Sequence, residues 1–262
     1  MYFLFKRLSF NIGLVLISLI LLLGIFGPLF SMDPEDQVRN EEQRIAINQP
    51  PGEYGLLGTD QQGQDYFANV AHGVKNSLFV GFIVGVITIL IATMVGGIAA
   101  YKGGLIDELA MLITNIVLVF PVLPALLVLS AFLEERSLNL IILIISLISW
   151  PWAARAIRSQ VLSLKEREFV SLAKISGTND VKIASLEILP HLLSYIALVF
   201  AISIGAAILT EAGISVVGLG PENTVTLGIL LQNAIAFESI RLGYWWIFVT
   251  PGILLTAFMF AL

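Results

Sequence analysis

The sequence predicts an all-α protein that crosses a membrane several times. Of its 262 residues, 57% are hydrophobic and only 13% are charged, and the mean hydropathy is +0.91. Soluble domains carry about a quarter charged residues, so this composition is typical of an integral membrane protein. The apolar residues also gather in runs close to the ~20 residues that a helix needs to cross the hydrocarbon core of a bilayer. We predict a polytopic membrane protein with six transmembrane helices.

The composition argues against several kinds of site. The chain has no cysteine, and therefore no disulfide framework and no thiolate metal site. No phosphate-binding P-loop sequence occurs, and the two histidines, His72 and His191, belong to no metal-ligand cluster and no nucleophile–base pair. The formal charge is −5, and no basic stripe suggests nucleic-acid binding. We predict no catalytic residue, no metal site, no cofactor and no nucleic-acid partner.

The first predicted span runs from Leu8 to Phe30 and follows Lys6 and Arg7. A cleaved signal peptide is the alternative, but its apolar core would be only ~7–15 residues long, with small residues at the cleavage site. This run is longer and ends in Gly27-Pro28-Leu29-Phe30, which is a poor cleavage site. We therefore favour a retained span.

A long polar stretch, Ser31 to Ser77, follows the first span. Its second part begins at Gly58 with Gly-Thr-Asp-Gln-Gln-Gly-Gln-Asp and leads into an expected helix from Tyr66 to Asn76. Asp60 and Asp65 suit turn and cap positions ahead of a helix. We favour that interpretation over direct contact of these two carboxylates with a substrate.

The remaining apolar runs give five more spans and one partial helix. The third run contains Asn115, Pro121 and Pro124; the prolines should kink it, and the amide should face protein or a cavity. The fourth run carries Trp150 and Trp152, which suit the membrane interface. The partial helix, Val225 to Phe237, is too short to cross and is interpreted as re-entrant. The predicted spans are Leu78 to Tyr101, Leu105 to Leu133, Leu138 to Trp152 with a helical extension to Ser163, Leu192 to Ile214, and Trp245 to Leu262. The last run is still apolar at Leu262, so we expect a truncated C terminus.

The polar loop between the fourth and fifth spans has helical character. Apolar residues recur at nearly helical spacing from Glu166 to Ile175. Gly177 should end that helix, and Thr178 or Asn179 should cap a second one that stops at Pro190. One apolar face is left over outside the bilayer, and such a face usually needs a partner.

The basic residues indicate the orientation of the chain. With six spans and the N terminus inside, nine Lys and Arg lie inside and five outside, which accounts for all 14. This distribution follows the positive-inside rule and places the loop before Pro190 in the cytoplasm. The inner residues are Lys6, Arg7, Lys102, Arg155, Arg158, Lys165, Arg167, Lys174 and Lys182, and the outer ones are Arg39, Arg44, Lys75, Arg136 and Arg241.

The same loop resembles that of the permease subunits of bacterial ATP-binding-cassette (ABC) importers. Their loop carries Glu-Ala-Ala, three residues, Gly, nine residues and Ile-x-Leu-Pro. Here Ser171-Leu172-Ala173 is followed by Gly177 and, nine residues later, by Glu187-Ile188-Leu189-Pro190. Ser171 and Glu187 depart from the pattern. The flanking Lys-Glu-Arg-Glu-Phe-Val at 165–170 is similar to the dipeptide, oligopeptide and nickel branch of the family.

Two further motifs resemble the same branch. The run from Gly58 to Asp65 is similar to Gly-Thr-Asp-x-x-Gly-Arg-Asp, with Gln64 in the place of the Arg, and Gly73 to Leu78 supplies its Gly-x-x-x-Ser-Leu ending. Glu-Ala-Gly-Ile-Ser-Val-Val-Gly-Leu-Gly at 211–220 resembles Glu-x-x-Leu-Ser-Phe-Leu-Gly-Leu-Gly. The first of these motifs is typical of one of the two permease types in a heteromeric importer.

The resemblance implies a type I ABC importer permease in two parts. Residues 1–77 would form the N-terminal transmembrane helix and an extracytoplasmic loop, and residues 78–262 the transmembrane core. The coupling loop, residues 155–190, would contact the ATPase subunit through Glu168, Ser171, Leu172, Ala173, Gly177, Asp180 and Pro190. Asn115, Pro121 and Glu211 are candidates for the translocation path, although Asn115 would serve equally well in an interhelical hydrogen bond.

The resemblance also implies partners and a location. These are a second permease subunit, in a heterodimer, two ATP-binding subunits that hydrolyse the ATP, an extracytoplasmic substrate-binding protein, and membrane lipid. The chain itself would be no enzyme and would lie in the cell membrane with its N terminus in the cytoplasm. Peptides are the favoured substrates, with nickel or another metal chelate as the alternative. A stand-alone channel or ion-coupled carrier is a second class, but such carriers more often show Asp or Glu in mid-span.

Overall fold

The structure, a computed structural model, describes residues 8–132 and 135–262. In these ranges every regular element is a helix, apart from three isolated bridges in the polar stretch after the first helix. The all-α prediction is confirmed. Lys6 and Arg7, which the orientation argument uses, lie outside the described residues, as do the end of the predicted third span at Leu133 and the adjacent Glu134.

The chain forms two compact units. The first comprises Met1–Gly81, Leu129–Ile141 and Ile208–Leu262, and the second comprises Phe82–Val128 and Ile142–Ala207. Helices α2, α5, α6 and α9 contribute residues to both units. The helices are α1 (Leu8–Phe30), α2 (Tyr66–Ala92), η1 (Thr93–Gly97), α3 (Ile98–Lys102), α4 (Gly104–Val119), α5 (Val122–Ala131), α6 (Leu138–Lys165), α7 (Glu168–Ile175), α8 (Asp180–Lys182), η2 (Ile183–Ile188), α9 (Leu189–Val216), α10 (Leu227–Ala236) and α11 (Trp245–Ala261), where η marks a π-helical segment.

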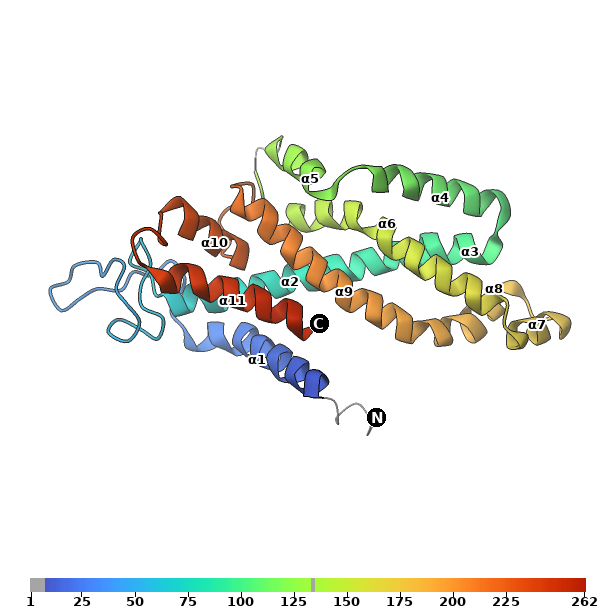
Figure 1. Cartoon of the computed structure of the whole chain (residues 1–262), viewed down its shortest axis with the longest axis horizontal. Coiled ribbons are helices and arrows are strands. Elements are labelled where there is room, and N and C mark those ends of the chain that lie inside the picture. The colour runs from blue at the N-terminus through green and yellow to red at the C-terminus, as the bar shows by residue number, and fades with distance from the viewer. Residues whose placement is uncertain (1–7, 133–134) are drawn as a thin grey trace. The chain divides into compact units, whose positions relative to one another are not determined.

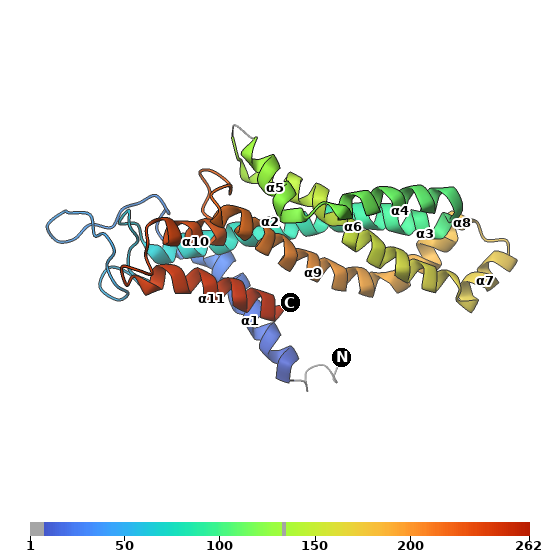
Figure 2. The same ribbon diagram turned by 45° about the horizontal axis from the view of Figure 1, so that its top comes forward.

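In the first unit, α1 packs through glycines. A Cβ atom added at Gly27 would lie 2.8 Å from the Cβ of Ala71 in α2, and one added at Gly13 would lie 3.2 Å from the carbonyl oxygen of Ala261 in α11. Small residues let membrane helices approach closely, which explains their use here. α1 and α11 lie side by side in both views of the ribbon (Figure 1, Figure 2).

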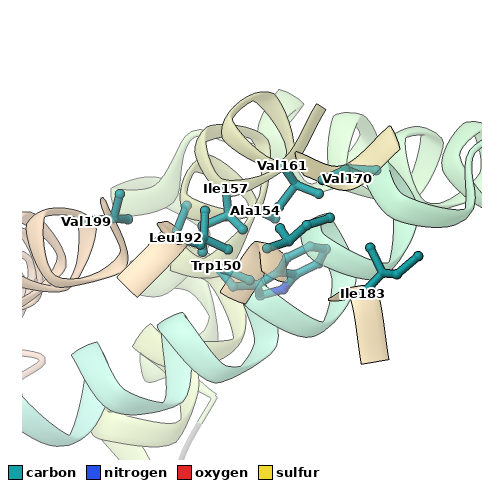
Figure 3. Close-up of a cluster of buried hydrophobic side chains, with 12 residues drawn as sticks. Trp150, Ala154, Ile157, Val161, Val170, Ile183, Leu192 and Val199 are labelled. Carbon is teal, nitrogen blue, oxygen red and sulfur yellow. The ribbon is translucent and has the colours of Figure 1, made fainter. Parts of the chain in front are cut away.

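In the second unit, one buried cluster joins the spans to the coupling loop. It contains Trp150, Ala154, Ile157 and Val161 of α6, together with Val170 of α7 and residues of η2 and α9 (Figure 3). Trp150 was expected at the membrane interface, but it is buried in this cluster, whereas Trp152 is half exposed. The remaining members are Ala92, Ala100, Ala153, Ile183, Ile188, Leu192 and Val199.

The number of clear spans is smaller than the six predicted. Among the described residues, four continuous helices are long and apolar enough to cross a membrane: Phe10–Phe30, Tyr66–Lys102, Leu138–Lys165 and Asp180–Val216. A fifth is obtained if α4 and α5 count as one broken span. The sixth predicted span, α11, is a helix of 17 residues, at the lower end of the ~17–25 that cross a bilayer.

The third predicted span is not one continuous helix. α4 ends at Val119, α5 begins at Val122, and their axes differ by 74°. Phe120 is extended, with φ −75° and ψ 123°, because the residue before a proline is driven out of the helical region. Pro121 therefore breaks the span where a kink was predicted.

Pro190 does not end a helix, which contradicts the prediction. A continuous helical stretch runs from Asp180 through Pro190 to Val216. The π-helical segment η2 ends at Ile188, so Pro190 stands in the first turn of α9. The hydrogen-bond register changes there, and a missing N–H and a proline ring are tolerated at such a turn.

Candidate functional site

The coupling loop is anchored to the second unit by the inner faces of α7 and η2. Val170 and Ile183 are completely buried in the cluster, and Phe169 and Ala173 pack against it partly buried. The 3.6-residue spacing of α7 places these apolar side chains on one face. Ala173, predicted to contact an ATPase, thus lies against the cluster.

The turn between α7 and α8 has the predicted chemistry. Gly177 adopts φ +74°, its N–H donates to the carbonyl of Lys174 at 3.0 Å, and the N–H of Thr178 donates to that of Ala173 at 3.1 Å. This pair of bonds is the Schellman ending of a helix. The Asn179 side chain then accepts from the N–H of Val181 at 3.0 Å. Of the two candidate caps, Asn179 is the one used.

The outer face of the coupling loop exposes large apolar side chains. Four large apolar side chains on it, those of Leu172, Ile175, Val181 and Leu186, are between 64% and 83% exposed. The predicted contact residues Glu168, Ser171, Gly177, Asp180 and Pro190 are exposed as well. Sequence spacing alone did not separate Ile175, Val181 and Leu186 from the inner face. Leu186, for example, is exposed although it follows the buried Ile183 by only three residues.

Polar contacts hold the coupling loop to α3 and α4. The Tyr101 hydroxyl donates to the Asp180 carboxylate at 2.8 Å. Lys165 donates to the carbonyl of Ala100 at 3.3 Å. Arg158 and Asp107 form a bidentate ion pair, in which Nε donates to Oδ1 and Nη2 donates to Oδ2, both at 2.6 Å. This geometry constrains the orientation of the two side chains as well as their distance. In both ribbon views α3, α7 and α8 lie at the same end of this unit (Figure 1, Figure 2).

Two of the predicted translocation residues lie in the second unit. Asn115 is exposed, and its side-chain oxygen accepts a hydrogen bond from the guanidinium of Arg155. The expectation of an interhelical hydrogen bond at Asn115 is therefore confirmed, because Asn115 belongs to α4 and Arg155 to α6. Pro121 is exposed at the break between α4 and α5.

The third predicted residue, Glu211, is completely buried in the first unit. One carboxylate oxygen accepts from the hydroxyls of Ser215 at 2.6 Å and Thr226 at 2.7 Å. Thr226 also caps α10 by accepting from the N–H of Ile229 at 3.2 Å. A Cβ atom at Gly228 would lie 2.6 Å from the Cα of Ala212. The Glu-to-Gly motif at 211–220 thus builds the contact between α9 and the short helix α10.

The Gly-Thr-Asp motif after the first span ties the polar stretch to the helices of the first unit. Gly58 adopts φ +72°, and a Cβ atom there would lie 2.2 Å from the carbonyl oxygen of Gln49. Asp60 accepts from the N–H groups of Gln62 and Gln64, both at 2.9 Å. The carbonyl of Thr59 accepts from the indole N–H of Trp246 in α11 at 3.3 Å.

The carboxylates of this motif serve the backbone, as predicted. Asp65 accepts from the N–H of Phe67 at 3.0 Å and so caps α2. Burial raises the pKa of Asp60, and the backbone N–H groups of Gln64 and Gln62 partly offset that increase. Within the part of the chain that the structure describes, no three His, Asp or Glu side chains gather in a group that could hold a metal ion.

Comparison with known proteins identifies the family. Residues 92–262, from the end of α2 through α11, match the family described as "binding-protein-dependent transport system inner membrane component". The chain belongs to this family. The permease subunit is 31% identical over 250 residues to the dipeptide transport system permease protein DppC of Bacillus subtilis, covering 95% of this chain and 76% of the relative.

Other relatives of the permease carry similar names. The oligopeptide transport system permease protein OppC of Mycobacterium bovis is 33% identical over 216 residues, covering 80% of this chain and 72% of the relative. A putative peptide transport system permease protein of Brucella suis is 30% identical over 254 residues, covering 97% of this chain and 83% of the relative. The predicted resemblance to this branch of permeases is confirmed. The chain is a multi-pass membrane permease subunit, and the relatives are permeases, not ATPases.

Proposed function

We propose that this permease carries peptides across the cell membrane in an ATP-driven importer. The observation that carries the proposal is the coupling loop, which is buried on one side and apolar and exposed on the other. The similarity to permeases of dipeptide and oligopeptide transport systems supports peptides over metal chelates as substrates. ATP would be bound and hydrolysed by two separate subunits, and a second permease would complete the path.

The exposed face of the coupling loop would dock in a groove of the ATPase subunit. Burying Leu172, Ile175, Val181 and Leu186 stabilises such a complex by the hydrophobic effect, at roughly 1.5–3 kcal/mol for each large side chain that becomes fully buried. Glu168 and Ser171 would lie at the polar edge of that contact. The buried anchors Val170 and Ile183 would transmit movement of the ATPase into α6 and α9, because packed interiors pass on displacement.

The proposed orientation places the N terminus and the coupling loop in the cytoplasm. The basic residues of the coupling loop support it through the positive-inside rule. The polar stretch in residues 1–77 would then face the extracytoplasmic side, where a substrate-binding protein delivers the peptide to the core formed by residues 78–262. Asn115 and Pro121 would line the translocation path, whereas the burial of Glu211 favours a role for it in positioning α10.

The test is co-purification of the permease with its ATP-binding subunits, followed by uptake of a labelled dipeptide into vesicles. Gly177→Val should disrupt the turn, because a β-branched residue disfavours φ > 0 and an ordinary residue loses ~1–2 kcal/mol there. We expect captured ATPase and uptake to fall about fivefold or more while membrane insertion is unchanged. Gly177→Asn is the matched control, because Asn tolerates this conformation.

Normal uptake by the Val variant would overturn the assignment of the coupling loop. Stable permease that captures no ATPase, yet moves solute in liposomes by itself, would overturn the importer.

A further inference from the structure

Two arginines of α6, about one turn apart, reach α4 in different ways. Arg158 meets the carboxylate of Asp107 through two contacts at 2.6 Å, so its charge is neutralised. Arg155 reaches only Asn115, whose side-chain oxygen accepts from its Nη2. An amide oxygen accepts a hydrogen bond but carries no charge. Arg155 forms no ion pair with any residue that the structure describes, and its positive charge is therefore uncompensated.

The unused donors of Arg155 have the geometry that a carboxylate requires. A guanidinium presents five N–H groups in a planar fork. Asn115 takes one of them, from Nη2, and this is the hydrogen bond that the side chain makes within the described part of the chain. Because Nη2 carries two N–H groups, one edge of the fork keeps two parallel donors. That edge can bind both oxygens of a carboxylate, as the guanidinium of Arg158 does.

Arg155 lies on the face of α6 that points away from the core of the second unit. The opposite face turns Ala154, Ile157 and Val161 into the buried cluster (Figure 3). At 3.6 residues per turn, positions spaced by four residues from Arg155 onward fall about half a turn from that buried face. These positions are exposed and polar, and they are Arg155, Ser159 and Ser163. The guanidinium is thus available to a molecule outside this unit.

The hydrogen bond to Asn115 holds the guanidinium at the depth of an apolar segment. The neighbours of Asn115 on α4 are large, apolar and more than half exposed: Leu112, Ile113 and Ile116. Such a surface belongs to a membrane-spanning helix and not to a loop in water. Charged side chains at this depth are costly in hydrocarbon, and they usually face a water-filled cavity where they mark a substrate path. An uncompensated charge beside Asn115 therefore indicates the translocation path.

We propose that Arg155 binds the C-terminal carboxylate of the transported peptide and that Asn115 positions the guanidinium for it. This inference rests on the proposed function and adds to it the chemical group that is recognised. The C-terminal carboxylate is an anionic group shared by all unmodified peptides, and the same guanidinium repels the ammonium group at the other end. Asn at position 115 keeps the site open, because an Asp there would pair with Arg155 and occupy its charge.

The experiment compares two peptides that differ only in this group. The assembled importer, in lipid nanodiscs without nucleotide or binding protein, is titrated with alanyl-phenylalanine and with its C-terminal amide, and NMR gives the two dissociation constants. We expect about fivefold tighter binding of the free carboxylate, the upper end of what a partly exposed ion pair contributes. Arg155→Gln should bind both peptides equally. The binding protein is absent, so the preference belongs to the membrane complex.

Asn115→Asp separates recognition from a purely structural role. The side chains have the same shape, and Asp would form an ion pair with Arg155 that strengthens the contact between α4 and α6. If Arg155 served only that contact, the Asp variant would keep the preference of the unchanged importer. We expect it to lose the preference, as Arg155→Gln does, while its melting temperature is maintained. Lys102→Gln is the matched control: it removes an exposed positive charge from the end of α3 and should keep the fivefold preference.

Several results would overturn the proposal. An unchanged importer that binds neither peptide, or both equally, has no carboxylate site. An equal loss of both peptides in Arg155→Gln would indicate a structural role or a contact with lipid phosphate. Uptake of the labelled dipeptide, driven by ATP and the binding protein, is measured on the same preparation. Normal uptake together with equal binding would remove the role of Arg155 and leave the importer standing, whereas absence of uptake and of ATPase capture would overturn the proposed function itself.

Discussion

Truncation of Ile183 should loosen the coupling loop without altering its outer face. The side chain is completely buried in the cluster, and Ile→Ala in such a site costs about 2–5 kcal/mol. Because each ~1.4 kcal/mol is a factor of ten in an equilibrium constant, opening of the loop should become at least about 30-fold more frequent. Hydrogen exchange of the backbone amides in residues 168–190 measures this directly.

Val181→Ala is the matched control on the same helical stretch. Val181 is 73% exposed, and a surface substitution changes stability by no more than about 0.5 kcal/mol. Its exchange should therefore change by about twofold or less. Capture of the ATPase subunit should decrease more in Val181→Ala than in Ile183→Ala, because Val181 contributes to the proposed contact surface. Equal acceleration of exchange in the two variants would refute the division of the coupling loop into a buried and a docking face.

Three further outcomes follow from individual contacts. Gly228→Ala should destabilise the first unit by about 1–3 kcal/mol in thermal unfolding, because the added Cβ would meet the Cα of Ala212; an unchanged melting temperature would contradict this packing. Arg158→Lys should lower the thermal stability of the second unit by about 1 kcal/mol or more, because an ammonium group cannot form the two-pronged contact with Asp107; a variant as stable as the unchanged chain would show that the second contact contributes little. Asp60→Asn should weaken the pH dependence of the stability of the polar stretch. Since burial raises the pKa of Asp60, its contribution to stability is present below the ordinary value of ~3.9 and is lost as the pH rises through the raised value. Protease resistance of the polar stretch should decrease from about pH 4 to pH 7 in the unchanged chain and less in the Asn variant.

Local chemistry accounts for the parts of the fold that were predicted correctly. The bounds of α1 are those of its apolar run, because a span is determined by its length and hydropathy. The turn at Gly177 and the cap at Asn179 depend on backbone conformations and hydrogen bonds within a few residues. The break at Pro121 is equally local. Such features need no knowledge of distant segments.

The tertiary structure decided the features that join distant residues. Pro190 would end an isolated helix. In the structure the helix continues past Pro190, because a π-helical segment precedes it and the buried Ile183 and Ile188 hold that segment in place. The sequence predicts Glu211 as a residue of the translocation path. In the structure its side chain is buried and accepts a hydrogen bond from Thr226, fifteen residues further along the chain. Which face of the coupling loop is buried likewise depends on the cluster.

Composition and short-range spacing are therefore enough to predict the class of the protein, the turn at Gly177 and the family motifs. What the motif residues touch depends on contacts between segments that are distant in the chain. The Gly-Thr-Asp motif binds α11 through Thr59 and Trp246, 187 residues apart, and Tyr101 fixes Asp180 across 79 residues. Contacts of this kind form because burial brings the segments together, and no local preference encodes the partner.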